Sequence, residues 1–290
     1  MSTTLEAALR RHVERLAGEI GERHVQRPEA LHAAERYIIE TLRAAGHEVT
    51  RQRYEAQGVD CANLEITIPG RRRAGEIVLA GAHYDTVPGS PGADDNASGV
   101  AAILELARLL REAQPARTIR LVAFVNEEPP FFFWGEMGSK VYARAARDRG
   151  DDIRVMLSLE MLGCFSDRKG SQNYPPLLGH FYPEQGNFIA FVSNLRSRRA
   201  LRQVFAAFRA SSEFPAEKLA APALVPGVAW SDQLSFWREG YPAAMVTDTA
   251  FFRYRHYHQP TDTAEKLDYP RMADVVAGLA RTLERLASDD

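Results

Sequence analysis

Apolar positions in the first part of the chain recur at helical spacing. Leu5, Leu9, Val13 and Leu16 form one stripe, and Ala34, Tyr37, Ile38, Thr41 and Leu42 form a second. Side chains three and four residues apart share one face of a helix, so this pattern predicts two helices within the first 46 residues. Gly46 is typical of the residue at which a helix ends.

Strand-like runs alternate with helical stretches over the rest of the chain. We expect strands at residues 48–54, 63–68, 77–82, 119–125, 153–159 and 241–247, and helices at 98–111, 136–147, about 195–210 and 271–286. Three of the runs, 77–82, 119–125 and 153–159, are almost continuously apolar, as central strands covered on both faces are. The arginines at 71–73 are expected to form an exposed hairpin tip. The alternation predicts an α/β fold with a βαβ unit around the helix at 98–111.

Length and charge narrow the class of protein. The chain has 290 residues, of which 45% are apolar, enough to bury a large core. Lys and Arg total 36 against 38 Asp and Glu, so we expect no general attraction for nucleic acid or for an anionic membrane. No stretch reads as a secretory signal or a membrane span. We therefore expect one domain over residues 1–290, located in the cytoplasm; the sequence does not indicate the oligomeric state.

Ionisable residues follow the apolar runs. His83 comes after the first run, Glu127 and Glu128 after the second, Glu160 after the third, and Asp248 after the run at 241–247. In open α/β sheets ligands bind outside the carboxyl ends of the strands, so these residues are expected to meet at one edge of the sheet. With Asp95 and His258 they offer the mixed nitrogen and oxygen ligands that zinc accepts. Two metal ions roughly 3.5–4 Å apart could share a carboxylate there and hydrolyse an amide.

Several motifs, in this order, resemble those of the zinc exopeptidase family, which contains bacterial aminopeptidases, glutamate carboxypeptidase and, more distantly, glutaminyl cyclases. They are the segments 83–85 (His-Tyr-Asp), 91–99 (Pro-Gly-Ala-Asp-Asp-Asn-Ala-Ser-Gly), 126–128 (Asn-Glu-Glu), 159–161 (Leu-Glu-Met), 231–232 (Ser-Asp) and 257–263 (Tyr-His-Gln-Pro-Thr-Asp-Thr). The match is spread over most of the chain. It implies a single-domain α/β/α sandwich with a mixed, mostly parallel central sheet.

The resemblance also implies a ligand set for two zinc ions. His83, Asp95 and Glu160 would hold one ion, and Asp95, Glu128 and His258 the other. Asp95 would be the bridge because the family's bridging aspartate directly precedes the Asn-x-Ser-Gly sequence, here 96–99. Asp94 remains a candidate supporting residue, and His256 is a less favoured alternative to His258.

Further roles follow from the same motifs. Glu127 resembles the family's general base and acid, which deprotonates the attacking water and then protonates the departing amine. Tyr257 matches a tyrosine that donates a hydrogen bond to the carbonyl oxyanion, although a packing role is an equal alternative. Asp85 is placed to receive the second imidazole N–H of His83, and Asp232 could do likewise for another histidine.

The sequence departs from the usual pattern of the family at three places. Glu160 stands where many relatives have aspartate, and Gln233 stands where histidine is common. The segment 129–134 (Pro-Pro-Phe-Phe-Phe-Trp) replaces a short Gly-rich turn. Its aromatic residues, Phe131 to Trp134, are expected to wall a substrate pocket, or else to pack into the core or form a subunit contact. Residues 166–186, rich in Pro, Gly and Tyr, are expected to cover the site as an ordered loop.

The expected function is hydrolysis of the N-terminal peptide bond of a peptide substrate, with preference for an apolar first residue if the Phe-rich segment lines the pocket. Without the resemblance, the residues themselves indicate only metal-assisted hydrolysis of an amide. The alternatives are glutaminyl cyclisation with a single zinc ion, a carboxypeptidase or amidohydrolase reaction, and a scaffold domain that has lost its chemistry. The same ligands would also accept other divalent metals.

Overall fold

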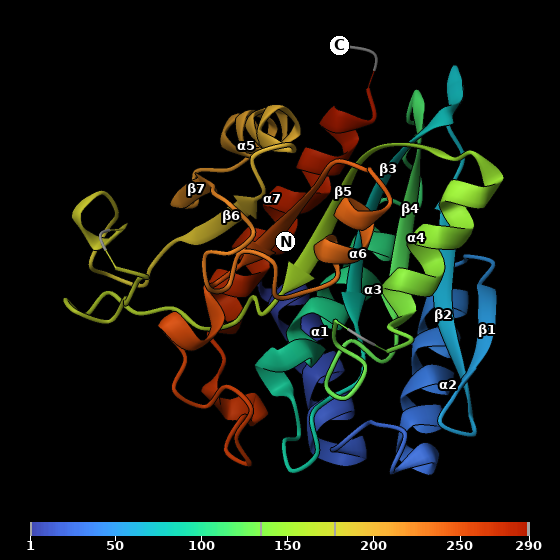
Figure 1. Cartoon of the computed structure of the whole chain (residues 1–290), viewed down its shortest axis with the longest axis horizontal. Helices are drawn as coiled ribbons and strands as arrows, with labels where there is room; N and C mark the ends of the chain where they lie inside the picture. Colours follow the sequence, from blue (N-terminus) through green and yellow to red (C-terminus); the bar gives the residue numbers. More distant parts are fainter. Residues whose placement is uncertain (1, 134, 177, 289–290) are drawn as a thin grey trace.

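The computed structural model describes residues 2–133, 135–176 and 178–288. Within them, eight strands form one mixed sheet in the order β1-β2-β4-β3-β5-β8-β6-β7 (Figure 1). The strands are β1 (Thr50–Ala56), β2 (Val59–Ile68), β3 (Arg73–His83), β4 (Arg117–Phe124), β5 (Asp152–Glu160), β6 (Ile189–Ser193), β7 (Ala216–Ala220) and β8 (Ala243–Thr247). The β1–β2, β2–β4 and β6–β8 pairs are antiparallel and the other four are parallel. The predicted mixed, mostly parallel sheet is confirmed.

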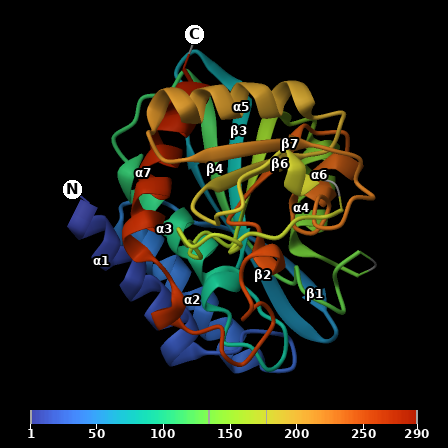
Figure 2. The same cartoon turned by 90° about the vertical axis from the view of Figure 1, so that its left-hand side faces the viewer.

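Helices cover both faces of the sheet. One layer contains α1 (Ser2–Val13), α2 (Pro28–Ala44), α3 (Gly99–Leu109), α5 (Arg198–Ser211) and α7 (Tyr269–Leu286), and the other contains α4 (Gly138–Arg149) and α6 (Gln233–Arg238). Figure 2 shows α1, α3 and α7 on one side of the sheet and α4 and α6 on the other. The α/β/α sandwich is therefore confirmed. None of the helices in the described ranges is both long and apolar enough to cross a membrane.

The apolar stripes predicted in the first 46 residues explain how α1 and α2 pack in the larger helical layer. Leu9, Val13 and Leu16 are fully buried, and α2 buries Ile38 and Leu42 in the same core. The second half of the first predicted helix is a π-helical stretch, Glu14–Ile20. Helix α3 connects the parallel strands β3 and β4, as the predicted βαβ unit requires.

The predicted hairpin tip at residues 69–73 is wrong. Strand β2 pairs with β4, not with β3, and the connecting loop passes over the start of β4. The main-chain N–H of Gly70 donates to Thr118 Oγ1 across 3.1 Å, and a Cβ at Gly70 would lie 2.6 Å from the backbone of residues 116–118. The expected exposure of the three arginines is found. The hairpin lies one strand earlier, between β1 and β2, where Gln57 and Gly58 have positive φ values of 51° and 78°.

Strands β6 and β7 were not predicted, and β6 changes the geometry of the last third of the fold. Because β6 runs antiparallel to β8, its C-terminal end lies at the opposite edge of the sheet from that of β5. Helix α5 therefore starts at that far edge. The exposed Arg196, Arg198 and Arg199 at its start therefore lie away from the predicted metal ligands.

Candidate metal centre

The five predicted ligands converge from five segments. His83 and Glu160 are the last residues of the parallel strands β3 and β5. Asp95 lies in the turn before α3, Glu128 follows β4, and His258 lies between β8 and α7. All are buried except His258, whose side chain is 30% exposed. The ligands thus stand at the carboxyl edge of the sheet, where the sequence pattern places them.

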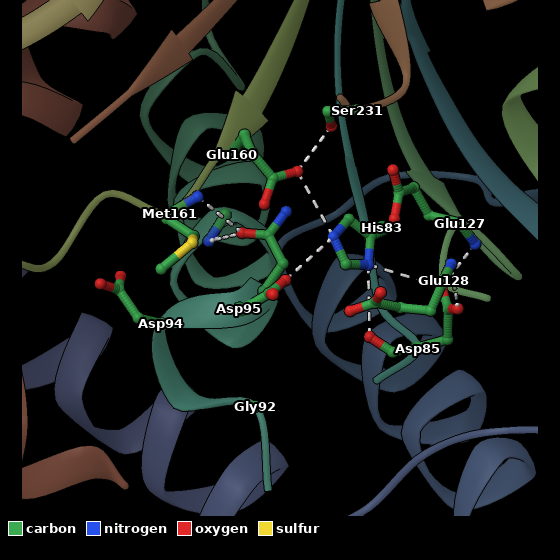
Figure 3. A network of polar contacts seen from close by, with 12 residues as sticks. His83, Asp85, Gly92, Asp94, Asp95, Glu127, Glu128, Glu160, Met161 and Ser231 are labelled. Atoms are coloured by element: carbon green, nitrogen blue, oxygen red, sulfur yellow. Dashed lines mark hydrogen bonds and ion pairs between the residues drawn. The ribbon is translucent and has the colours of Figure 1, made fainter. Parts of the chain in front are cut away.

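Asp95 directs one carboxylate oxygen to each histidine. Its Oδ1 lies 3.3 Å from Nε2 of His83, and its Oδ2 lies 3.1 Å from Nε2 of His258. Glu160 Oε2 lies 3.4 Å from the His83 nitrogen, and Glu128 Oε2 lies 3.4 Å from the His258 nitrogen. The donor atoms form three groups, each within 4.8 Å: His83 with Asp95 and Glu160, Asp95 with Glu128 and His258, and His83 with Glu127 and Glu128. The first two correspond to the predicted pair of ligand sets. Figure 3 shows His83 facing Asp95 and Glu160, while Asp94 points away from it.

The buried charge of this cluster favours a bound cation. Burial disfavours the imidazolium of His83, but Glu160 and the other carboxylates outweigh it and raise the pKa of His83 well above its usual value. Burial together with Asp95 raises the pKa of Glu128 to about 7. In the described part of the chain, Glu128 Oε1 is buried without a hydrogen-bond partner. Carboxylates outnumber imidazoles here, so divalent cations would satisfy atoms that the protein leaves unpaired.

Glu127 lies beside the predicted ligands, within 4.8 Å of His83 and Glu128, but belongs to neither predicted ligand set. Its side chain is buried and lines a cavity of about 350 Å³ together with Asp95, Glu128, Glu160 and His258. Burial is the main cause that raises the pKa of Glu127 well above its usual value, and the neighbouring Glu128 adds to it. A carboxyl group that binds a proton more readily than usual and faces a cavity is suited to proton transfer.

Asp85 supports the site differently from the expectation. Its Oδ1 accepts the main-chain N–H of Glu127 across 3.0 Å, and its Oδ2 accepts that of Glu128 across 3.1 Å. His83 Nδ1 lies 3.2 Å from the main-chain oxygen of Asp85 and 3.5 Å from its carboxylate. Asp85 therefore fixes the loop that carries Glu127 and Glu128, in addition to facing the imidazole (Figure 3).

Two further residues that hold the site by hydrogen bonds were not predicted from the sequence. Asp262 accepts the main-chain N–H groups of Asp94 and Asp95, across 2.9 and 3.1 Å, and the hydroxyl of Tyr254. Ser231 donates to Glu160 Oε2 across 2.5 Å. Both residues lie inside motifs of the family resemblance, and this position could have indicated their role.

Asp232, in the segment 231–233 (Ser-Asp-Gln), does not hold a histidine in place. No hydrogen bond or ion pair joins Asp232 to a histidine in the described ranges, and both of its carboxylate oxygens are buried without a partner. Burial raises the pKa of Asp232 to about 7. Gln233 donates to the main-chain oxygen of Val228 across 3.1 Å.

Tyr257 lies over the metal cluster. Its ring stacks on His258 with centroids 3.8 Å apart, and burial raises its pKa. Its hydroxyl forms no hydrogen bond within the described part of the chain, although Tyr257 lines the cavity with Glu127 and Glu160. A hydroxyl in this state can donate to a bound ligand. His256, in contrast, is half-buried, and its Nδ1 lies 2.8 Å from the hydroxyl of Thr261.

The aromatic segment divides between core and cavity. Phe131 is buried in the main core, whereas Phe132 and Phe133 line the 350 Å³ cavity together with Pro129. Trp134 lies outside the described residues. Of the expected positions, the core is found for Phe131 and the wall of a cavity for Phe132 and Phe133.

A second cavity, of about 100 Å³ and mainly apolar, adjoins the first at Glu160, Trp230 and Tyr257. Gln172, Tyr174 and Tyr182 line it, so the loop at 166–186 covers this part of the site, as expected. The other walls come from β6, β7 and β8 and from residues 226–230 and 249–252.

The model of the family described as Peptidase family M28 matches residues 63–283. The chain belongs to peptidase family M28. Membership in M28 makes the protein a peptidase, and the resemblance to zinc exopeptidases is confirmed. The candidate metal cluster, from His83 to His258, lies entirely within the matched segment.

Curated relatives of this M28 chain include proteins with and without a stated activity. It is 40% identical over 284 residues to Uncharacterized protein YfbL of Escherichia coli (strain K12), which covers 95% of this chain and 86% of that protein. It is 29% identical over 240 residues to Leucine aminopeptidase 1 of Arthroderma otae, covering 77% of this chain and 58% of that protein. The chain thus spans little more than half the length of that aminopeptidase.

Solved structures share the fold. A zinc aminopeptidase from Bacillus subtilis, BSAP, has a TM-score of 0.74 at 16% identity, covering 98% of this chain and 95% of that one. The glutaminyl cyclase of Fimbriiglobus ruber has a TM-score of 0.71 at 20% identity, covering 96% and 94%. At these identities the likeness shows the architecture.

Proposed function

We propose that this M28 peptidase is an aminopeptidase that holds two zinc ions. The observation that carries the proposal is the position of Asp95, whose two oxygens face His83 and His258 separately. Bound there, zinc ions would activate a water molecule and polarise the scissile carbonyl. The donor set of two imidazoles and three carboxylates fits zinc.

The charge of the cavity favours the amino end of a peptide. Its described lining includes Asp95, Glu127, Glu128 and Glu160 but no lysine or arginine. A free α-ammonium group is stabilised by such carboxylates, whereas the terminal carboxylate that a carboxypeptidase must bind would be repelled. The adjoining apolar cavity provides space for the side chain of the first residue.

Two side chains take part in the reaction beyond holding metal. Glu127 accepts a proton from the attacking water at its carboxylate and gives it to the departing amine nitrogen. Tyr257 donates its unpaired hydroxyl to the carbonyl oxygen as negative charge develops there. Asp85 holds the main chain of Glu127, so the base stays in place during both proton transfers.

The test is mass spectrometry of a peptide mixture incubated with zinc-loaded protein, alongside a chelator-treated control. We expect residues to be lost one by one from the amino end, and no loss with the chelator. Loss from the carboxyl end, or loss of about 17 Da as ammonia from N-terminal glutamine, would replace the assigned reaction while keeping the metal chemistry. The Glu127→Gln variant should lose activity by about 10²-fold or more while retaining zinc; unchanged activity would remove Glu127 from the mechanism.

A further inference from the structure

The apolar cavity runs across one face of the sheet from the predicted metal ligand Glu160 to Glu217, a carboxylate that has no role in the proposed reaction. Glu160 is in register with Thr247, Thr247 with Ala190, and Ala190 with Glu217. Residues paired in register place their side chains on the same face of a sheet. Glu160, Thr247, Ala190 and Glu217 all line the cavity, so this row forms its floor from β5 to β7.

A parallel row of apolar residues completes the floor. Met245 is in register with Val192, and Val192 with Leu219, and all three line the cavity. Phe188 and Phe252 contribute apolar walls. The channel between the metal site and Glu217 is therefore suited to a hydrocarbon chain.

Glu217 stands at the far end of this channel without a partner. It is half-buried, and no hydrogen bond or ion pair to its carboxylate is found in the described ranges. Burial raises its pKa, and Arg209 and Lys218 offset this only in part. The side chain of the neighbouring Lys218 packs on the opposite face, where its Nζ lies 4.4 Å from the centre of the Phe205 ring on α5. The carboxylate in the cavity thus lacks a cation.

Aromatic rings stand beside Glu217. Tyr174 and Tyr182 are stacked with centroids 5.8 Å apart, both line the cavity, and the charge of Glu217 contributes to raising the pKa of each. Their hydroxyls donate to the main-chain oxygens of Pro183 and Lys218, which fixes the two rings. A carboxylate beside tyrosine rings is a combination that stabilises an ammonium or guanidinium group.

We propose that the cavity is a subsite for a long side chain with a cationic end, that of an N-terminal arginine or lysine, with Glu217 as the residue that determines this specificity. The inference rests on the proposed aminopeptidase function. Three strand spacings separate Glu160 from Glu217 in the sheet, about 14 Å between their Cα atoms. A substrate α-carbon at the metal site would leave a distance that an extended arginine side chain can span with its methylene groups along Val192 and Met245.

The test compares N-terminal arginine with citrulline, which has nearly the same shape but no charge. The measured quantity is kcat/KM for zinc-loaded protein on arginine, citrulline and leucine 7-amido-4-methylcoumarin. Wild type should prefer arginine over citrulline by at least about tenfold, since a charged hydrogen bond separates the two. In Glu217→Gln the arginine-to-citrulline ratio should fall close to one. Lys218→Gln, one position along on the other face, should retain the wild-type ratio.

The outcomes separate the subsite from the proposed function. Turnover of leucine with an arginine-to-citrulline ratio near one in the wild type, or a ratio that Glu217→Gln leaves intact, would overturn the subsite and leave the aminopeptidase in place. Absence of release from all three substrates, with zinc bound, would overturn both.

Discussion

The Nε atom of Arg23 donates a hydrogen bond to the main-chain oxygen of Tyr84 across 2.8 Å. Arg23 is fully buried, and its other guanidinium donors reach the main-chain oxygens of Leu16, Gly21, Pro91 and Gly92. Tyr84 follows the ligand His83, and Gly92 lies three residues before Asp95. One side chain thus joins the N-terminal helices to both ligand-bearing loops, although it precedes the segment matched to the family, 63–283.

Arg23→Met should therefore be strongly destabilising. The change removes the guanidinium donor from five main-chain oxygens, three of them in buried hydrogen bonds, and we expect the free energy of unfolding to fall by more than about 3 kcal/mol. Urea unfolding of the metal-free protein measures it. Arg27→Met is the control, because the Arg27 side chain is 60% exposed and pairs with Glu22 at 3.4 Å, an arrangement worth less than about 1 kcal/mol. Equal losses in the two variants would refute the role given to Arg23.

Metal content should follow the division of ligands around Asp95. If two zinc ions bind per chain, His83→Ala and His258→Ala should each lower the bound zinc toward one ion, and Asp95→Ala should weaken both sites because both use its carboxylate. Elemental analysis after dialysis gives the stoichiometry. His256→Ala should keep the wild-type zinc content, because His256 lies two residues from His258 but pairs with the hydroxyl of Thr261. One tightly bound ion in the wild type would instead favour the single-zinc cyclase alternative.

Tyr257→Phe should separate catalysis from packing. Since the Tyr257 hydroxyl has no hydrogen bond in the described part of the chain, its removal should leave the melting temperature unchanged. If it stabilises the developing oxyanion, kcat should fall by about 10-fold to 100-fold with little change in KM. Tyr254→Phe makes the opposite comparison, because the Tyr254 hydroxyl donates to the buried Asp262 across 2.8 Å and its loss should lower stability. An unchanged kcat in Tyr257→Phe would leave Tyr257 a packing residue.

Much of the fold could be predicted because the central strands carry their own signal. The central parts of strands β3, β4 and β5 are buried on both faces, so their sequences are almost continuously apolar there. Strand β7 contains Glu217 and Lys218 at the sheet edge, so its pattern is not that of a buried strand. The position of β2 beside β4 depends on a loop crossing that no local pattern encodes, which is why the hairpin prediction failed.

The site divides in the same way. The candidate metal ligands follow strand ends or lie in motifs, and both signals can be read from the sequence. Arg23 gives no such signal, because an isolated arginine usually lies at the surface and only the tertiary structure supplies its buried carbonyl partners. The subsite around Glu217 arises from the register of β8, β6 and β7, which no local pattern reveals.

Glu105 should make stability depend on pH at the contact between α1, α2 and α3. It is buried, with Oε1 3.2 Å from His12 Nε2 and Oε2 2.8 Å from Arg108, while His12 Nδ1 contacts the Tyr37 hydroxyl at 2.7 Å. Burial acts to raise the pKa of Glu105, but the hydrogen bonds from His12 and Arg108 outweigh it, so the pKa lies below the ordinary glutamate value of 4.5. The folded protein then binds fewer protons here than the unfolded chain at acid pH. The stabilisation is complete above the unfolded value and is lost as the pH falls through the folded one.

Glu105→Gln should therefore lower the free energy of unfolding by about 1–3 kcal/mol at pH 7, and by progressively less as the pH falls from 5 to 3. Urea unfolding at each pH, without metal, gives the difference from wild type. Glu112→Gln is the matched control on the same side of the molecule, because the Glu112 side chain is 90% exposed and should change stability by less than about 0.5 kcal/mol at every pH. A Glu105 difference that stayed constant from pH 7 to 3 would mean that the loss comes from packing and not from the carboxylate's charge.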